Sequence, residues 1–231
     1  MDNPSSSDYH EQDAEYGDML NSAIDAFGHG DFDSAKALFR QVLDICEDEA
    51  KAHFYLGLIA AKQDFHEKAI EQFKLAISHD DLSEDAYLYM AKSFLEIDEN
   101  LLATESLIKA YKLNSTNFDV NYHLAFAYFL QADYDKAIKY FDLALNLAPN
   151  NRDSYYYKAI ALIRQDKYAK ALKCFRLILD LYPNDHYTLY QKSLIYLNQN
   201  EKRKAIILLR KAYELGNPEA EDILKLINVD E

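Results

Sequence analysis

One alanine register recurs every 34 residues through most of this chain, at Ala35, Ala69, Ala103, Ala137, Ala171 and Ala205. Four residues after each alanine stands a bulky apolar residue: Phe39, Phe73, Leu107, Phe141, Phe175 or Leu209. Three residues further on stands another apolar residue: Val42, Ala76, Ala110, Ala144, Ile178 or Ala212. Twelve residues before each alanine stands a small residue: Ala23, Gly57, Ala91, Ala125, Ala159 or Ser193. A period of this length, kept without insertion, is typical of a repeat architecture in which each unit packs on its neighbours.

Each repeat carries two segments with helical periodicity, as residues 118–151 illustrate. Apolar residues recur at helical spacing in residues 120–131 and again in 134–147, and Pro149 ends the second segment because proline cannot continue a helix. One such helical hairpin is too small to bury its apolar side alone. We therefore expect the hairpins to stack.

The same pattern predicts a helix boundary near most turns. We expect a first helix from an Asp13 cap to about Phe27, a second over 33–46, and hairpins over 50–62 with 66–79, 84–96 with 100–113, 118–131 with 134–147, 152–164 with 168–181, and 186–198 with 202–215. Gly216, Asn217 and Pro218 should end one helix and start a short last one, because glycine, asparagine and proline suit those three positions.

The repeat resembles the tetratricopeptide repeat. The second unit carries Leu56-Gly57, Ala69, Phe73 and Ala76, the fourth carries Leu124-Ala125, Tyr128, Ala137, Phe141, Ala144 and Pro149, and the fifth carries Tyr155, Ala159, Ala171, Phe175 and Pro183. The chain departs from the motif in having no tryptophan and in its closing prolines, of which only Pro149 and Pro183 are in register. The resemblance implies an all-α fold, an α-solenoid in which antiparallel helix pairs form a right-handed superhelix.

This organisation divides the chain into three parts. We expect a disordered acidic tail over residues 1–13, a continuous solenoid over 14–218 and a C-terminal capping helix with tail over 219–231. The six repeats are expected at about 16–49, 50–83, 84–117, 118–151, 152–185 and 186–218. A terminal repeat would otherwise expose its apolar face, which is why the last short helix is expected to cap the stack.

Charge limits the classes of partner. The chain has a net charge of −14, and residues 1–50 alone hold 13 acids and two bases, a net of −11. Nucleic-acid binding and attraction to anionic membranes both need the opposite sign. The uncharged apolar runs are far shorter than the roughly 20 residues of a membrane span, so no membrane insertion is expected. The first residues lack a secretory signal, and Cys46 and Cys174 stand in distant repeats, so we expect free thiols and a cytoplasmic location.

No catalytic or metal-binding motif is recognisable. The seven histidines are scattered and five glycines could hardly build a phosphate loop. The acidic pair at 80–81 and the pair at 48–49 fall in polar turns between repeats, where they read as solvated. The sequence therefore predicts a protein without enzymatic activity or cofactor.

The resemblance implies a concave groove lined by the first helix of each pair. Carried over by register, the groove residues are Lys51, Phe54, Leu58, Lys62, Asp85, Leu88, Lys92, Leu95, Asp119, Tyr122, Phe126, Phe129, Asp153, Tyr156, Ile160, Arg164, Tyr187, Tyr190, Leu194 and Asn198. They are apolar and aromatic for a surface that faces only water, although any one of them could instead belong to the core. Leu20 and Ile24 stand where a lysine and asparagine clamp for acidic C-termini would be, so that clamp is missing.

The sequence thus predicts an adaptor or scaffold that binds another protein. Its expected ligand is an apolar peptide or an amphipathic helix, which basic flanks would suit because Asp85, Asp119 and Asp153 flank the groove. Two alternatives stay open. One is a secretion-type or holdase chaperone for an unfolded client, and the other is self-association, in which the groove takes a neighbour's terminal helix or acidic tail.

Overall fold

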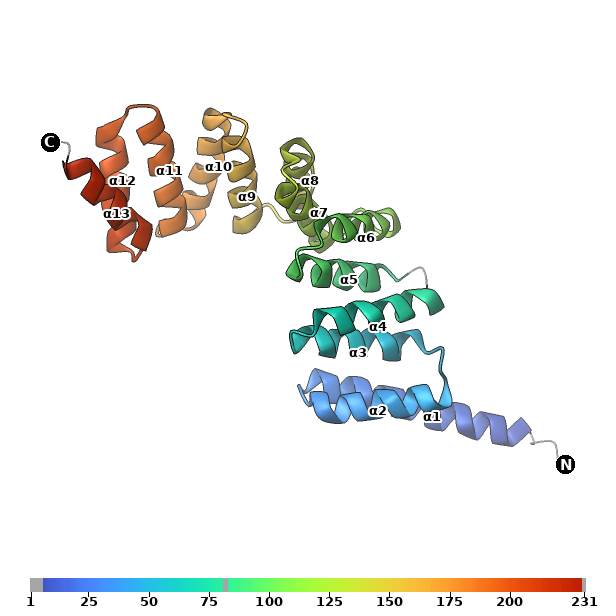
Figure 1. Cartoon of the computed structure of the whole chain (residues 1–231). Coiled ribbons are helices and arrows are strands. Elements are labelled where there is room, and N and C mark those ends of the chain that lie inside the picture. Colours follow the sequence, from blue (N-terminus) through green and yellow to red (C-terminus); the bar gives the residue numbers. More distant parts are fainter. Residues whose placement is uncertain (1–5, 81–82, 230–231) are drawn as a thin grey trace. The chain divides into compact units, whose positions relative to one another are not determined.

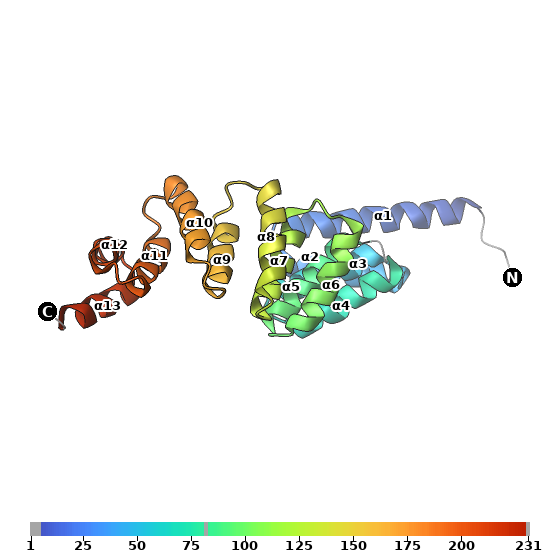
Figure 2. The ribbon, with the colours of Figure 1, turned by 90° about the horizontal axis from the view of Figure 1, so that it is seen from above.

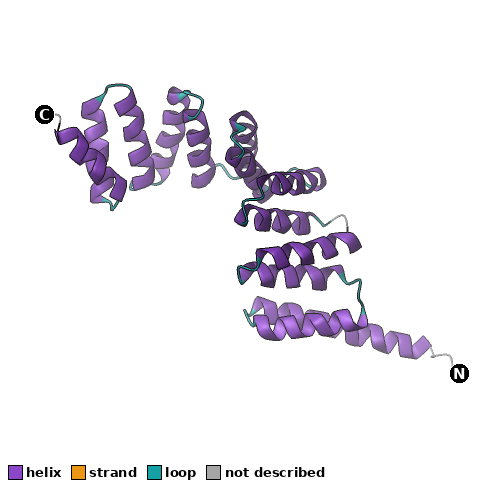
Figure 3. Ribbon diagram, in the orientation of Figure 1, coloured by secondary structure: helices purple, strands orange, loops and turns teal. Residues whose placement is uncertain are grey.

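The structure, a computed structural model, describes the backbone of residues 6–80 and 83–229 and the side chains of residues 16–80 and 83–227. Within these ranges the chain is all-α, with thirteen helices and no strand (Figure 3). The helices are α1 (Ser6–Gly28), α2 (Phe32–Ile45), α3 (Ala50–Lys62), α4 (His66–His79), α5 (Glu84–Glu96), α6 (Asn100–Leu113), α7 (Phe118–Leu130), α8 (Tyr134–Leu147), α9 (Arg152–Ile163), α10 (Tyr168–Leu181), α11 (His186–Asn198), α12 (Lys202–Glu214) and α13 (Pro218–Val229). The expected helical pairs are confirmed.

The first helix starts earlier than the sequence indicated. It begins at Ser6, so residues 6–13 of the expected disordered tail are helical, and residues 1–5 of that tail lie outside the described residues. Negative charge at a helix N-terminus is stabilised by the helix dipole, and Asp8 and Glu11 stand in the first turns. That interaction favours helix where low apolar content alone had suggested disorder.

Within each pair the turn is built the same way. One residue adopts the left-handed conformation after the first helix, at Gly30, Asp64, Asp98, Ala132, Asp166 and Asn200. The next residue donates its N–H to a carbonyl five positions back, as Asp133 does to Tyr128 at 3.0 Å. This is the Schellman arrangement, which satisfies carbonyls at the helix end. Its recurrence every 34 residues explains why the helices stop in phase.

The first helix of each pair starts at a capping side chain. Glu49, Ser83, Asn117, Asn151 and Asp185 each accept a hydrogen bond from a backbone N–H in the first turn of the helix that follows. Such a side chain replaces a hydrogen bond that the helix cannot make for itself. These caps also stand 34 residues apart, so the starts of the helices keep the same phase as their ends.

The helices form two compact units, residues 1–115 and 116–231, which are described separately. The boundary follows the third repeat, where Leu107 replaces the phenylalanine of most repeats. In the first unit α1 to α6 stack in order, and in the second α7 to α13 do so (Figures 1 and 2). The sequence had predicted one continuous solenoid across this boundary.

All four repeated registers lie in the core. The anchor alanines are fully buried, and so are the bulky residues four positions on: Phe39, Phe73, Leu107, Phe141, Phe175 and Leu209. The small residues before the anchors are buried as well, among them Gly57 and Ser193. The period therefore marks the side of each helix that packs inside its repeat.

The last helix closes the core of the second unit. Gly216 has a φ of 90°, and Asn217 caps α13 by accepting a hydrogen bond from the Ala220 N–H at 2.9 Å. Ala220 and Ile227 are buried against Leu209 and its neighbours. Ile227 occupies the register that holds a small residue in the six repeats. The predicted stop, restart and apolar contact of this helix are confirmed.

None of the helices in the described part of the chain is long and apolar enough to cross a membrane. Cys46 and Cys174 are both free thiols, the first half-buried and the second buried.

Candidate functional site

A row of aromatic side chains runs along α7 in the second unit. Phe118, Tyr122, Phe126 and Phe129 follow at helical spacing, and neighbouring ring centroids lie 5.9, 6.4 and 6.3 Å apart. All four side chains are half-buried, so each keeps part of its ring accessible. The sequence had predicted Tyr122, Phe126 and Phe129 as groove residues, and the structure brings these three together.

Tyr157 of α9 completes this row. Its ring lies 4.9 Å from Phe126 and 5.6 Å from Phe129, in edge-to-face geometry with both. It also stacks on the buried Phe141 at 6.3 Å. Offset and edge-to-face pairs of this kind contribute energy beyond their buried area. We call Phe118, Tyr122, Phe126, Phe129 and Tyr157 the α7 ladder.

Tyr157 was missed in the sequence, although a signal for it existed. Tyr55, Tyr89 and Tyr157 stand in one register of the repeat. Tyr55 stacks on Phe39 at 5.3 Å and Tyr89 on Phe73 at 6.3 Å, as Tyr157 does on Phe141. The tyrosine register thus links each first helix to the second helix of the preceding repeat.

The hydroxyl end of the ladder is electrostatically constrained. Burial raises the pKa of the Tyr122 phenol above its ordinary value, and Tyr157 and the Asp153 carboxylate raise it further. The phenol therefore stays protonated and remains a hydrogen-bond donor. Asp119 and Asp153, both predicted groove residues, are exposed beside it.

Arg152 does not cancel this negative charge, because it is held by its own carboxylates. Its guanidinium donates two hydrogen bonds to Asp185, at 2.5 and 3.0 Å, and one to Asp153 at 2.7 Å. It also lies over the Tyr156 ring at 4.9 Å. Burial opposes ionisation of Asp185, but hydrogen bonds from Arg152 and from the Thr188 N–H outweigh it and hold the pKa of Asp185 below its ordinary value.

The remaining predicted residues of the second unit divide by exposure. Tyr156, Ile160, Tyr190 and Leu194 are half-buried, and the first two pack against the core around Phe175. The exposed ones stand at helix ends: Arg164, Tyr187 and Asn198. Asn198 donates a hydrogen bond to the Tyr168 hydroxyl at 2.9 Å.

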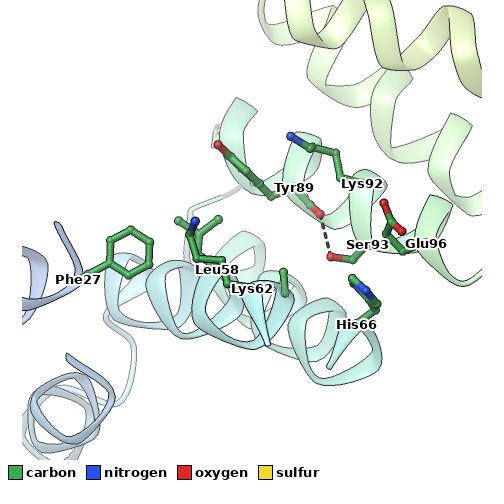
Figure 4. A pocket seen from close by; sticks show the side chains of 9 residues that line it. Phe27, Leu58, Lys62, His66, Tyr89, Lys92, Ser93 and Glu96 are labelled. Carbon is green, nitrogen blue, oxygen red and sulfur yellow. Dashed lines mark hydrogen bonds between the residues drawn. The ribbon is translucent and has the colours of Figure 1, made fainter. Parts of the chain in front are cut away.

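The first unit has a pocket of about 430 Å³ among α1, α3, α4 and α5 (Figure 4). Of the predicted groove residues, Leu58, Lys62 and Lys92 line it. The sequence missed its other lining residues, which are Phe27, Ala61, His66, Tyr89, Ser93 and Glu96. Lys92 lies over the Tyr89 ring at 4.9 Å, so one wall combines a cation with an aromatic face.

A second hollow of about 300 Å³ in this unit takes the predicted Lys51, Phe54 and Asp85. Phe54 is half-buried and lies 5.8 Å from Tyr89. Leu95 is half-buried too. Leu88 is a correction, because it is only 4% exposed and belongs to the core. Aromatic side chains at its register reach past the neighbouring helices, whereas the shorter leucine is covered by them.

The two units therefore differ in charge. Lysines line the hollows of the first unit, at Lys51, Lys62 and Lys92, together with Asp85 and Glu96. Carboxylates flank the α7 ladder of the second unit, at Asp119 and Asp153. The predicted repulsion of acidic ligands applies to the second unit.

No three histidine, cysteine or acidic side chains gather as a metal site among the residues that the structure describes. The surface is instead one of aromatic rings, aliphatic side chains and solvated charges, which can bind a polypeptide without reacting with it.

Sequence comparison gives one curated relative for part of the chain. A TPR repeat-containing protein of Methanocaldococcus jannaschii is 30% identical over 129 residues, which are 54% of this chain and 22% of the relative. The chain thus spans about a fifth of that protein's length. The likeness concerns the repeats and does not extend to the rest of the relative.

Solved structures share the arrangement of helices. A crystal structure of MamA aligns with a TM-score of 0.67 at 25% identity, over 74% of this chain and 92% of that one. YrrB, described as a TPR protein with an unusual peptide-binding site, gives 0.72 at 18% identity over 81% and 97%. Pseudomonas aeruginosa PilF gives 0.72 at 17% identity over 93% and 99%. At the identities of YrrB and PilF the likeness shows the fold alone.

Family profiles cover most of the repeats. One tetratricopeptide repeat profile matches residues 117–184, and another matches residues 20–86 and 156–220, which together are more than half of the chain. The phase of the buried registers and the helical pairs agree with these matches. The chain belongs to the tetratricopeptide repeat family.

Proposed function

We propose that this protein is a non-enzymatic adaptor that binds an apolar segment of a partner protein on the α7 ladder. The fold supports protein–protein interaction as the general role. The observation that carries the finer proposal is the ladder itself, a contiguous row of half-buried aromatic rings from two helices.

Such a row is costly to leave facing water. Single exposed apolar residues are common on proteins, but contiguous apolar patches mark interaction sites. Tyrosine and phenylalanine supply large contact areas with few rotatable bonds, so little conformational entropy is lost when a ligand covers them. Residues of this kind dominate the binding energy of many interfaces.

Charge narrows the chemistry of the segment. Asp119 and Asp153 are exposed beside the ladder, and Arg152 is already paired with Asp185. An amphipathic helix or extended peptide with lysine or arginine next to its apolar side chains would complement these carboxylates. The predicted apolar ligand with basic flanks therefore remains the proposal for the second unit.

The structural neighbour YrrB is described as having a peptide-binding site. That description concerns YrrB, and at its level of identity it lends this chain only the same fold. The proposal depends on the residues of the ladder.

Selection from a random 12-residue peptide library against the full chain tests this proposal. Selected peptides should combine aromatic or large aliphatic residues with lysine or arginine, and they should lose enrichment on a Phe126→Ala, Tyr157→Ala bait. Leu130→Ala is the matched control, because Leu130 is exposed on α7 but stands outside the ladder. Equal enrichment on all three baits would contradict the proposal.

A holdase would behave differently from an adaptor. It would suppress the aggregation of several unrelated unfolded proteins at similar ratios, whereas an adaptor has no such effect. Light scattering of heated client proteins, with and without this chain, separates the two roles.

A further inference from the structure

A crevice of about 360 Å³ lies on the other side of α9 from the predicted groove, between α8, α9 and α10. Ile138, Leu162 and Leu177 give it an apolar lining, and lysines from α9 and α10 surround it. On α9, Lys158 and Leu162 face it, while Tyr156 and Ile160 stand about half a turn away on the groove side. We call this feature the α8–α10 crevice.

Its positive charge is only partly compensated. Lys158 pairs with Asp142, and Lys167 lies 3.9 Å from Asp135. Lys170 and Lys173 are exposed, and neither pairs with a carboxylate within the described parts of the chain. A chain with a net charge of −14 thus carries a row of lysines on α10 at 167, 170 and 173.

The row belongs to α10 and is not a general property of the repeat. An equivalent crevice of about 340 Å³ lies three repeats earlier, in the first unit. There Phe65 and Glu71 stand at the registers of Lys167 and Lys173. The lysines on α10 are therefore a local feature, and they call for an acidic ligand.

The chain itself carries an acidic helical segment. α1 has 23 residues, whereas its partner α2 has 14. The first residue of α1 that packs on the core among the described side chains is Tyr16. In Figures 1 and 2 the start of α1 extends beyond α2. This arm, residues 6–15, contains four acids and neither lysine nor arginine.

We infer that the arm of one copy docks in the α8–α10 crevice of a second copy. The acids Asp8, Glu11 and Glu15 recur at spacings of three and four residues, and the lysines on α10 recur at spacings of three. Two helices laid side by side would thus bring charges of opposite sign together once per turn. Tyr9 of the arm gives the apolar lining a side chain to bury. The inference does not rest on the α7 ladder, which lies on the other side of α9.

A contact of this kind joins different surfaces of the two copies. It is heterologous, so association can continue beyond a dimer unless a ring closes. It is also electrostatic, and ionic strength should weaken it, because the screening length falls from about 30 Å at 0.01 M salt to about 3 Å at 1 M.

Sedimentation equilibrium of the full chain tests the inference. At about 0.02 M salt the average mass should rise with protein concentration, and at about 0.5 M salt it should stay at that of the monomer. Lys170→Glu with Lys173→Glu should weaken the association at low salt at least about tenfold. Lys74→Glu with Lys112→Glu is the control of equal net charge, with exposed lysines of the first unit, and it should associate more tightly than the crevice variant.

A charge exchange identifies the arm as the occupant. An Asp8→Lys, Glu11→Lys variant should fail to associate alone, and so should the crevice variant, but an equimolar mixture of the two should associate. A monomer at every concentration in low salt would overturn the inference. So would a mixture that stays monomeric, or equal association of the crevice variant and its control.

Discussion

Gly57 of α3 lies so close to Phe73 of α4 that a side chain at position 57 has no room. A Cβ atom built on Gly57 would approach the Phe73 Cε1 to 2.6 Å, well inside van der Waals contact. The Phe73 ring is fully buried, so it cannot swing into solvent. The small residue that recurs before each anchor alanine is thus, at this repeat, a requirement for the two helices to meet.

Gly57→Ala should therefore destabilise the protein. Overpacking of a core costs about 1–3 kcal/mol, which exceeds the gain of up to about 1 kcal/mol from replacing a helical glycine. Gly17→Ala is the matched control, because nothing lies within 4 Å of its Cβ position in α1. Urea denaturation should place the two midpoints on opposite sides of wild type. A Gly57→Ala protein as stable as Gly17→Ala would show that Phe73 yields easily.

Ala132→Gly should stabilise the second unit. Ala132 has a φ of 59° in a turn where the other repeats place glycine, aspartate or asparagine. The left-handed conformation costs an alanine about 1–2 kcal/mol, and the greater chain entropy of glycine returns about half of that. We expect a net gain of about 0.5–1 kcal/mol in the free energy of unfolding. Asn200→Gly should gain less, because asparagine tolerates this conformation; an equal gain would point to another cause.

Thr188→Val should be neutral or stabilising. The Thr188 hydroxyl is fully buried and has no hydrogen-bond partner among the residues described. Valine has the same shape, and it already occupies this register at Val120. Removing an unsatisfied buried hydroxyl should add up to about 1 kcal/mol, measured by thermal unfolding. Thr104→Val should not gain, because the Thr104 hydroxyl donates to the Asn100 carbonyl at 2.9 Å. A loss at Thr188 would indicate that its hydroxyl is satisfied in solution.

Asp185→Asn should change how stability depends on pH. The pKa of Asp185 is lowered in the folded protein, so its contribution is present above the ordinary carboxyl pKa near 4 and is lost as pH falls through the lower folded value. Asparagine keeps a cap for the Thr188 N–H but loses the ion pair with Arg152. At pH 7 the variant should lose about 1–2 kcal/mol, and this difference should shrink below about pH 4.

Asp153→Asn is the control for that experiment, because its side chain is 52% exposed and its pairing with Arg152 is screened. It should change the unfolding midpoint little at any pH. A gap between wild type and Asp185→Asn that persists unchanged to pH 2.5 would contradict the assignment.

The repeat could be predicted closely because its punctuation recurs with its core. Helix ends depend on the left-handed turn residues and helix starts on caps such as Asn117 and Asn151, and all of these keep the period of 34. The start of α1 could not be predicted in the same way. It precedes the first anchor, and its acidic composition had suggested disorder.

The candidate site was predicted less completely. A period tells which positions are equivalent, but it does not tell how far each side chain is covered by the next helix. Phe54, Leu88 and Tyr122 share one register, yet Leu88 alone of the three is buried. Tyr157 joins the ladder from a register that the groove pattern did not include, and its contact with Phe126 arises only when α7 and α9 are placed together.

The most direct test of the account is the affinity of a ladder-binding peptide for wild type and for a chain without the central ring. Isothermal titration with a peptide from the library selection should show Phe126→Ala weakening binding by about 2 kcal/mol, roughly thirtyfold. Leu130→Ala should leave the affinity unchanged, and circular dichroism should show that all three proteins are folded at the titration temperature. Equal affinity of wild type and Phe126→Ala would contradict the claim that the α7 ladder binds the partner.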